Sequence, residues 1–319
     1  MEHLSPILPS FASLYYLAPP GLHLSNLPFP RFCLGDAVHR HPPFNGLGSN
    51  TCIQDAFNLA WKLAYVHRGQ ASPSLLETYT LERQPVGSGI IARANQALRD
   101  HAHVWDALGA LPPTVTERQQ QFTELSSHSA AGKKRRLALR EAIKGTGHEY
   151  HGLGTEMGQH YAGAAVHDAD EDAPYSPMGR AADDPVYFYE PNTYPGSRLP
   201  HVWLNKAVPT TPVSTIDVAG RGRFVLFTGV GGDTWKAAAA RISRELGVPL
   251  EAYSIGYRQD WEDVYFDWEA VCGVEESGAV LVRPDRFVAW RAKEVLGGVD
   301  ECAARLGQVM RSVLGLQES

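Results

Sequence analysis

The sequence predicts an α/β protein made of two parts, and three observations support this fold class. Apolar residues recur with helical spacing between residues 50 and 144. Short apolar runs alternate with amphipathic helical segments between residues 201 and 314. A stretch rich in proline and acidic residues, 166–200, lies between the two patterns and reads as a linker. The predicted organisation is an extended or disordered lead-in at 1–30, a largely helical part at 31–165, the linker, and an α/β domain at 201–319.

The bulk composition is that of an ordinary globular protein. The chain has 319 residues, of which 44% are hydrophobic and 20% charged, and its formal net charge is −6. This balance predicts no broad basic face and therefore no nucleic-acid partner. No run of about 18 apolar residues occurs, which predicts no membrane partner. The N-terminus lacks a basic leader and contains several prolines, so it is not a clean signal peptide.

The cysteine pattern excludes a structural zinc site. The four cysteines are Cys33, Cys52, Cys272 and Cys302, and no two of them form a CxxC pair. Isolated cysteines are typical of a reduced, intracellular chain, and we expect a cytoplasmic protein.

The first elements of the helical part have clear local signals. RFCLGD (31–36) reads as a short apolar strand that ends in a turn. A helix is predicted over residues 50–68, with Ser49 or Asn50 as its cap and Gly69 as its stop. Its apolar residues predict one buried stripe, formed by Ile53, Phe57, Trp61 and Ala64.

Further helices are predicted at 73–83, 85–108 and 117–144. The last contains KKRR (133–136), which is typical of a solvated helix face and not of a nucleic-acid patch. Glu82, Arg83 and Pro85 end the first of these helices. They are either an ion pair that braces the glycine-containing loop at residues 46–50 or an exposed helix end with a proline stop, and the second interpretation is favoured.

The C-terminal pattern is cleaner. Strands are predicted at 201–205, 223–229 and 251–257, and a helix at 233–246 that Asp233 or Thr234 caps and Gly247 stops. Two further strands flank a Pro-Asp turn within 279–292, and a helix closes the chain at 300–314. The order β–α–β, hairpin, α predicts a thioredoxin-like plan. The position where a redox member carries CxxC is GVGGDTW (229–235), so thiol–disulfide chemistry is not expected.

The sequence GLGSNT (46–51) is close to a dinucleotide-binding glycine loop, and the residues around it decide between two interpretations. The GxGxxG fingerprint requires a third small residue, a strand directly before the loop and an acid about 20 residues later. Here the third position is Thr51, two prolines separate the loop from the strand, and residue 70 is Gln70. A pyrophosphate site of this kind is therefore not expected.

The second interpretation places the edge of a flavin at this loop. Asp36 can accept hydrogen bonds from ribityl hydroxyls, and glycines let backbone amides approach a ligand closely. The loop leads directly into a helix N-terminus, whose partial positive charge favours an electron-rich group. The alternative is a plain capped helix after a Gly/Pro turn, and the residues alone leave both interpretations open.

A resemblance favours the flavin. GDAVHRHPPFNGLGSNTCIQDAFNLAWKLAYVHRG, followed by LLETYTLERQPVG, resembles the second FAD motif of the aromatic-ring monooxygenases, especially the phenol hydroxylase-like flavoproteins. It extends through GLGTEMGQHYAGAAV to LVRPDRFVAWR, over residues 31 to about 315. The resemblance implies an α/β chain with an incomplete, largely helical portion of an FAD-binding domain and a C-terminal thioredoxin-like domain. The implied cofactor-binding residues are Gly35, Asp36, Pro43, Gly46, Leu47, Gly48, Ser49 and Asn50.

The same resemblance implies FAD as cofactor, NADPH as reductant and a small phenolic substrate, in a homodimer. Family members carry a GxGxxG unit before the GD segment, and no such unit precedes it here. We therefore expect either a truncated chain or one that depends on a partner for the missing half, and poor FAD binding by this chain alone. The alternative function is a non-catalytic dimerisation or interaction protein derived from this family.

The residues between the GD turn and the glycine loop can be read in two ways. His39 and His41 beside Asp36 have the composition of a metal site. The resemblance instead implies that His39, His41 and Pro42 line the substrate side of the loop, and no metal is predicted. No single catalytic acid or base can be named from the sequence.

Overall fold

The computed structural model describes residues 32–317, so the predicted lead-in at 1–30 lies outside the described residues. The chain divides into two compact units. Unit 1 consists of Met1–Asp55 and Val86–Glu156, and unit 2 of Ala56–Pro85 and Met157–Ser319. Two long helices, α1 (Gly48–His67) and α2 (Thr78–Leu108), contribute residues to both.

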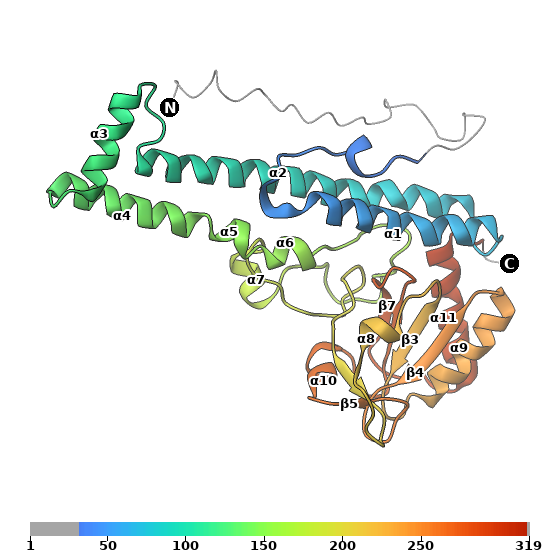
Figure 1. The fold of residues 1–319 in the computed structure, drawn as a ribbon. Helices are drawn as coiled ribbons and strands as arrows, with labels where there is room; N and C mark the ends of the chain where they lie inside the picture. Colours follow the sequence, from blue (N-terminus) through green and yellow to red (C-terminus); the bar gives the residue numbers. More distant parts are fainter. Residues whose placement is uncertain (1–31, 318–319) are drawn as a thin grey trace. The chain divides into compact units, whose positions relative to one another are not determined.

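The described part of unit 1 is helical (Figure 1). Two 3₁₀ turns, η3 (Gly35–Ala37) and η4 (Phe44–Gly46), precede α1. After α2 come the helices α3 (Val115–Ser126), α4 (Ala130–Gly145), α5 (Gly147–Tyr150) and α6 (Leu153–Met157). Figure 1 shows α4 alongside the C-terminal part of α2.

Two sequence predictions for this region are wrong. Residues 32–34 form no strand: within residues 32–317 no backbone ladder pairs with them, and a strand requires such a ladder. The helix predicted over 117–144 is interrupted at 127–129. The interruption follows from a cap, because the Ser129 hydroxyl accepts a hydrogen bond from Gly132 N (2.9 Å) and starts α4 afresh.

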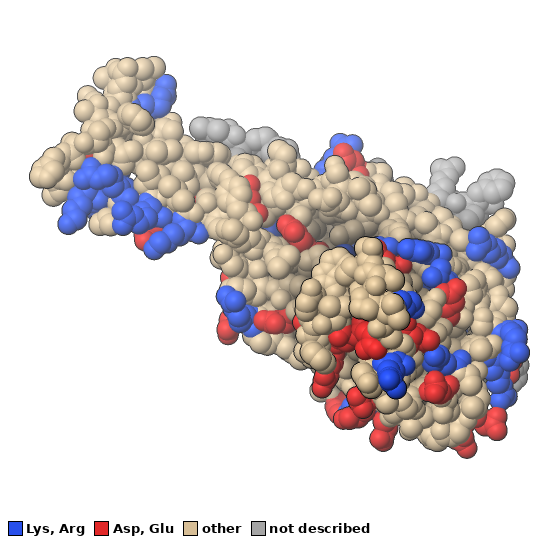
Figure 2. Space-filling model, turned by 60° about the horizontal axis from the view of Figure 1, so that its bottom comes forward, with Lys and Arg blue, Asp and Glu red and all other residues tan. Residues whose placement is uncertain are grey.

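The basic run of α4 is mostly solvated, as predicted. Lys133, Lys134 and Arg136 are exposed, and Figure 2 shows Lys and Arg gathered along this helix. Arg135 differs, because its guanidinium donates to Glu124 Oε2 (3.1 Å) and to the carbonyl oxygens of Asp106 and Ala107 (3.3 Å each). Arg135 therefore helps to join α4 to α2 and α3.

Unit 2 contains the predicted thioredoxin-like sheet, with strand order β4-β3-β6-β7. Strands β3 (Phe224–Thr228) and β4 (Leu250–Ser254) are parallel and are connected by α9 (Asp233–Leu246). Strands β6 (Ala279–Val282) and β7 (Val288–Ala292) form the antiparallel hairpin, and α11 (Val299–Leu314) closes the fold. Gly247 adopts a left-handed conformation (φ 62°) and ends α9 as predicted, but Gly232 occupies the N-cap, so neither Asp233 nor Thr234 does.

Both faces of this sheet are covered. Phe224 and Leu226 of β3 pack with α9 and α11 on one face, and the intervening Val225 and Phe227 pack on the other. The second face is covered by a small antiparallel sheet of order β2-β1-β5, which the sequence predicts only at β1. Its strands and their flanking helices are β1 (Trp203–Asn205), β2 (Val213–Ser214), α8 (Thr215–Val218), β5 (Glu262–Asp263) and α10 (Asp267–Val271).

The segment between these parts, 166–200, contains the short helix α7 (Gly179–Asp183) and pairs its acids with bases of the thioredoxin-like fold. Glu171 accepts two hydrogen bonds from Arg291 (2.7 Å each), and Asp170 accepts one from Trp290 Nε1 (2.7 Å). These contacts tie the segment to strand β7.

The buried stripe predicted for α1 is wrong at its N-terminal end. Ile53 and Phe57 are 66% and 45% exposed, whereas Trp61 is buried beside Phe224 (ring centroids 5.7 Å apart). The buried positions of this helix include the polar residues Asn58 and Lys62. Their burial is possible because each has a charged hydrogen-bond partner in unit 2.

Those partners form a fully buried charge network. Lys62 Nζ and Asn58 Nδ2 both donate to Glu82 Oε2 (2.7 Å each), and Asn58 also donates to Asp285 (3.1 Å). Arg283, at the end of β6, donates to both oxygens of Glu82 (2.6 and 2.8 Å) and of Asp285 (3.0 and 2.6 Å). The four charged side chains balance, two positive against two negative.

The exposed helix end predicted at residues 82–85 is therefore wrong. Glu82 and Arg83 are 1% and 4% exposed, and Arg83 donates to Tyr161 Oη (2.9 Å). Helix α2 begins at Thr78 after the short turn η5 (Pro73–Glu77) and continues through Pro85 to Leu108. The missing N–H of Pro85 removes one backbone hydrogen bond, and the buried contacts of Glu82 and Arg83 outweigh this loss.

Candidate functional site

The GD turn, residues 35–39, presents the Asp36 carboxylate to solvent. Gly35 is buried and has φ +61°, a conformation that favours glycine. Its carbonyl accepts the N–H groups of Val38 (2.9 Å) and His39 (3.0 Å), which closes the turn. Asp36 is exposed, and its backbone carbonyl accepts a hydrogen bond from Arg40 Nε (3.1 Å). An exposed carboxylate on a closed turn is available to ligand hydroxyl groups.

The glycine loop is shaped by two consecutive left-handed residues, Asn45 (φ 66°) and Gly46 (φ 62°). Gly46 is exposed, and a Cβ added there meets no atom within 4 Å. The Asn45 side chain donates to the carbonyl of Glu149 (3.2 Å), and the Glu149 carboxylate lies 2.5 Å from His101 Nε2. The bend of the loop is therefore fixed from α5 and α2, while Gly46 leaves its outer side open.

The first turn of α1 follows the glycine loop directly and has backbone amides without a bonded acceptor in the described part of the chain. Within the described residues, no acceptor is bonded to the backbone amides of Gly48, Ser49 or Asn50. Ser49 and Asn50 are exposed, Gly48 is half-buried, and the side chain of Leu47 is buried beneath them. The prediction that Ser49 or Asn50 caps this helix is wrong, because both residues lie inside it. The side-chain amide of Asn50 instead donates a hydrogen bond to Gly46 O (3.4 Å). Three N–H groups and the positive end of a 20-residue helix form an anion-favouring surface.

The residues predicted for the substrate side lie in different surroundings. His39 is buried (6% exposed), and its Nε2 lies 2.8 Å from the Asp55 carboxylate. His41 is half-buried, its Nδ1 lies 2.9 Å from Pro42 O, and its ring lies beside Gly48. Pro42 is half-buried and Pro43 exposed. His41 and Pro42 thus lie next to the helix start, whereas His39 is part of the support of the turn.

Sequence reasoning missed the residues that support this loop. Asp55 of α1 bonds to Gly35 and His39 of the GD turn. Glu149 of α5 bonds to Asn45 of the glycine loop, and His101 of α2 bonds to Glu149. Glu149 lies 104 positions from Asn45, and no local pattern signals that pairing. Asp55 carries no local signal either, because it lies opposite the predicted apolar stripe of this helix and reads as a solvated position.

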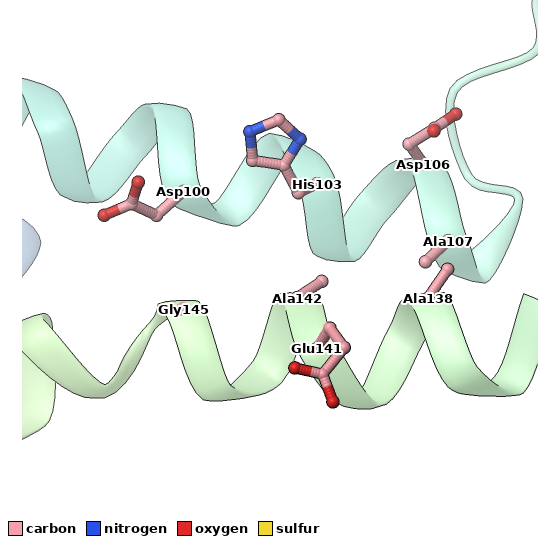
Figure 3. A pocket seen from close by; sticks show the side chains of 8 residues that line it. All are labelled: Asp100, His103, Asp106, Ala107, Ala138, Glu141, Ala142 and Gly145. Atoms are coloured by element: carbon pink, nitrogen blue, oxygen red, sulfur yellow. The ribbon is translucent and has the colours of Figure 1, made fainter.

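Other candidate chemistry is limited. Within residues 32–317 no group of three or more His, Cys, Asp or Glu side chains is arranged to bind a metal ion. A pocket between α2 and α4 contains none of the predicted site residues (Figure 3). Its side chains are small or acidic apart from one histidine: Asp100, His103, Asp106, Ala107, Ala138, Glu141, Ala142 and Gly145. No described helix is long and apolar enough to cross a membrane.

Comparison with known families assigns both parts of the chain. The model of the FAD binding domain matches residues 30–94, which contain the GD turn, the glycine loop and α1. The model of the aromatic-ring hydroxylase C-terminal domain matches residues 192–316, which contain the thioredoxin-like sheet. The chain belongs to the family of FAD-dependent aromatic-ring hydroxylases.

Individual relatives agree with this assignment. The chain is 42% identical to a phenol 2-monooxygenase of Pseudomonas sp. (strain EST1001) over 83% of this chain and 42% of that protein. It is 44% identical to a 2,4-dichlorophenol 6-monooxygenase of Delftia acidovorans over 88% of this chain and 47% of that protein. The flavin-dependent monooxygenase PieE, solved in complex with FAD and substrate, superposes with a TM-score of 0.80 and 39% identity, covering 90% of this chain and 48% of PieE. The chain thus spans less than half of the length of each of these three proteins.

Proposed function

We propose that this chain forms the flavin-edge portion of an FAD-dependent, NADPH-using hydroxylase that acts on a small phenolic substrate. Two observations carry the proposal: Asp36 is exposed on its turn, and the backbone amides of Gly48, Ser49 and Asn50 have no bonded acceptor among the described residues. Oppositely polar groups that face solvent together fit a ligand with hydroxyl groups at one end and an electron-rich ring at the other.

Each group of residues is proposed to bind a different part of the cofactor. Asp36, on the turn begun by Gly35, accepts hydrogen bonds from ribityl hydroxyls. Gly48, Ser49 and Asn50 present backbone N–H groups at the helix start, where the dipole favours the negative charge of a reduced flavin, and Gly46 and Leu47 shape the loop that leads into it. FAD held by these residues would supply the redox chemistry of the hydroxylation, with NADPH as its reductant. Pro43 forms a rigid wall beside the loop.

His41 and Pro42 are proposed for the substrate side of the same loop. His41 lies beside Gly48, so a ligand held at the helix start is close to its imidazole. His39 is excluded from direct substrate contact in this proposal because it is buried against Asp55. We further propose that the chain forms a homodimer, as the family resemblance implies. A cytoplasmic location is also proposed, in keeping with four free cysteines.

The test compares two preparations: the chain alone, and the chain co-expressed with the N-terminal half of the Pseudomonas phenol 2-monooxygenase. Flavin content is read from the visible absorbance after dialysis against FAD, and turnover from NADPH oxidation with and without phenol. We expect little retained flavin in the first preparation, and flavin with phenol-stimulated NADPH oxidation in the second. Asp36→Asn should weaken flavin retention there, whereas Asp106→Asn, a matched charge change on the exposed surface of α2, should not.

Two results contradict the proposal in different ways. Stoichiometric flavin in the chain alone overturns the partner-dependent part and leaves the hydroxylase function standing. Absence of flavin and of phenol-stimulated NADPH oxidation from both folded preparations overturns the enzymatic function, and favours a non-catalytic dimerisation or interaction protein.

A further inference from the structure

The Asp55 carboxylate connects the GD turn to helix α1. Asp55 lies in the second turn of α1 and is 2% exposed. Its Oδ2 accepts the backbone N–H of Gly35 (3.1 Å) and lies 2.8 Å from Nε2 of His39. One carboxylate oxygen therefore joins Gly35, the first residue of the turn, and His39, whose backbone N–H helps to close it.

The turn also packs directly on the helix. A Cβ added at Gly35 would lie 2.8 Å from Sγ of Cys52, so the turn backbone lies directly against this half-buried thiol. Cys52 precedes Asp55 by three residues and therefore lies on the same helical face. His39 contacts α2 as well, because a Cβ added at Gly87 lies 3.4 Å from His39 Cδ2. The imidazole is thus held between a carboxylate of one helix and a glycine of the other.

We propose that Asp55, together with His39, is a positioning residue that fixes the turn 35–39 against α1 and so sets the place of the Asp36 carboxylate. As far as it concerns flavin, the inference rests on the proposed function. Both side chains are too buried to touch a ligand themselves (2% and 6% exposed). Their effect is geometric, since a carboxylate that accepts two buried donors holds both with charge-assisted hydrogen bonds.

The alternative is that Asp55 only neutralises a buried polar group, without control of the turn. The two roles predict different behaviour of Cys52, because the turn contacts its half-buried thiol at Gly35 and displacement of the turn would expose it further. Burial and the carboxylates of Asp36 and Asp55 raise the pKa of this thiol. Removal of either acid therefore increases thiol reactivity through charge, and only removal of Asp55 increases it further by opening the turn.

The experiment uses the full chain with Cys33→Ser, because Cys33 is exposed while Cys272 and Cys302 are buried. The rate of Cys52 modification by a chromogenic disulfide reagent is compared in Asp55→Asn and Asp36→Asn. Local opening of a turn that loses its anchoring hydrogen bonds should raise the rate by about tenfold for Asp55→Asn. Asp36→Asn controls for charge and should raise it by no more than about twofold, because Asp36 is exposed and screened.

Two further variants keep the test decisive. Asp55→Glu keeps the charge and should return the rate towards that of the parent chain, and His39→Gln, which spares the Gly35 bond, should give an intermediate rate. His39→Gln also replaces Asp55→Asn if that variant does not fold. Equal rates in Asp55→Asn and Asp36→Asn, or an unchanged rate in His39→Gln, overturn the positioning role.

Flavin retention in the co-expressed preparation separates this inference from the proposed function. If Asp55→Asn exposes Cys52 while even the parent chain binds no flavin, the turn is held as inferred and the flavin function is wrong. If the parent binds flavin and Asp55→Asn binds it equally with Cys52 still protected, the positioning role alone is wrong.

Discussion

Replacement of Arg283 by methionine is expected to destabilise unit 2 severely. The side chain is fully buried and donates four hydrogen bonds to the carboxylates of Glu82 and Asp285, at 2.6 to 3.0 Å. Methionine keeps much of the volume but leaves two buried carboxylates with Lys62 as the one cation of the network. Breaking a buried ion pair by removal of one partner costs about 3–5 kcal/mol, and the expected loss lies in this range.

Urea unfolding followed by tryptophan fluorescence measures this loss. Trp61 is buried, and its ring centroid lies 5.3 Å from the Arg283 guanidinium carbon, so it is the tryptophan, among the seven of the chain, whose emission senses the network. The matched control is Arg241→Met, which removes an exposed arginine that also pairs with two acids, Glu245 and Asp300 (2.7 Å each). We expect no measurable change in the control, because solvent screens exposed ion pairs.

A compensating variant tests the cause of the loss. Arg283→Met combined with Asp285→Asn leaves Lys62 paired with Glu82 at 2.7 Å and restores charge balance. The double variant should be more stable than Arg283→Met alone, although it carries one more substitution. The charge-balance reasoning is refuted if Arg283→Met unfolds at the same urea concentration as the Arg241→Met control. It is also refuted if the double variant is less stable than Arg283→Met.

Three further predictions concern the same helices and the GD turn. Burial raises the pKa of Glu82, but the charges of Arg283 and Lys62 outweigh burial and hold this pKa below 4.5. The stability that the ionised carboxylate contributes is complete above about pH 4.5 and is lost on acidification. The unfolding free energy of Glu82→Gln should therefore fall less steeply with acid than that of the parent chain. Gly35→Ala places a Cβ at a residue with φ +61° and only 2.8 Å from Cys52 Sγ, so this variant should displace the turn and expose Cys52 to thiol reagents. Gly46→Ala is the control, because Gly46 has a similar φ but an added Cβ there meets open space, and this variant should leave Cys52 as it is. Ser129→Ala removes the cap of α4 and should cost about 1 kcal/mol with a small loss of helical circular dichroism; equal stability of the variant and the parent contradicts this.

Local signals determined how much of the fold was predictable. Helix α9 was predicted at 233–246 and is found at Asp233–Leu246, because an amphipathic period and the stop Gly247 both lie within the segment. The hairpin of β6 and β7 was predicted from its Pro-Asp turn for the same reason. The predictions failed where contacts with residues distant in sequence determine the structure. The helix predicted to end at Arg83 continues, because Glu82 is held by Arg283, 201 positions away.

The candidate site shows the same division. The GD turn and the glycine loop could be recognised because Gly35, Asp36 and Gly46 through Asn50 are contiguous or nearly so. Their supports could not, because Glu149 and His101 reach the loop from other helices and no spacing rule links them to it. A sequence pattern therefore locates the surface that meets a ligand more readily than the residues that hold this surface in place.

Helix α1 explains why its hydrophobic pattern was a poor guide to its burial. Asp55, Asn58 and Lys62 are spaced at i, i+3 and i+7, so they form a polar stripe along one face, and all three are at most 2% exposed. Asp55 has its partners in unit 1, at Gly35 and His39, whereas Asn58 and Lys62 have theirs in unit 2, at Glu82. An apolar stripe can pack against many surfaces, but each of these side chains is satisfied only by a specific donor or acceptor. The polar stripe of α1 therefore fixes the register of the helix in each unit, and its substitution should disturb the GD turn at one end and the charge network at the other.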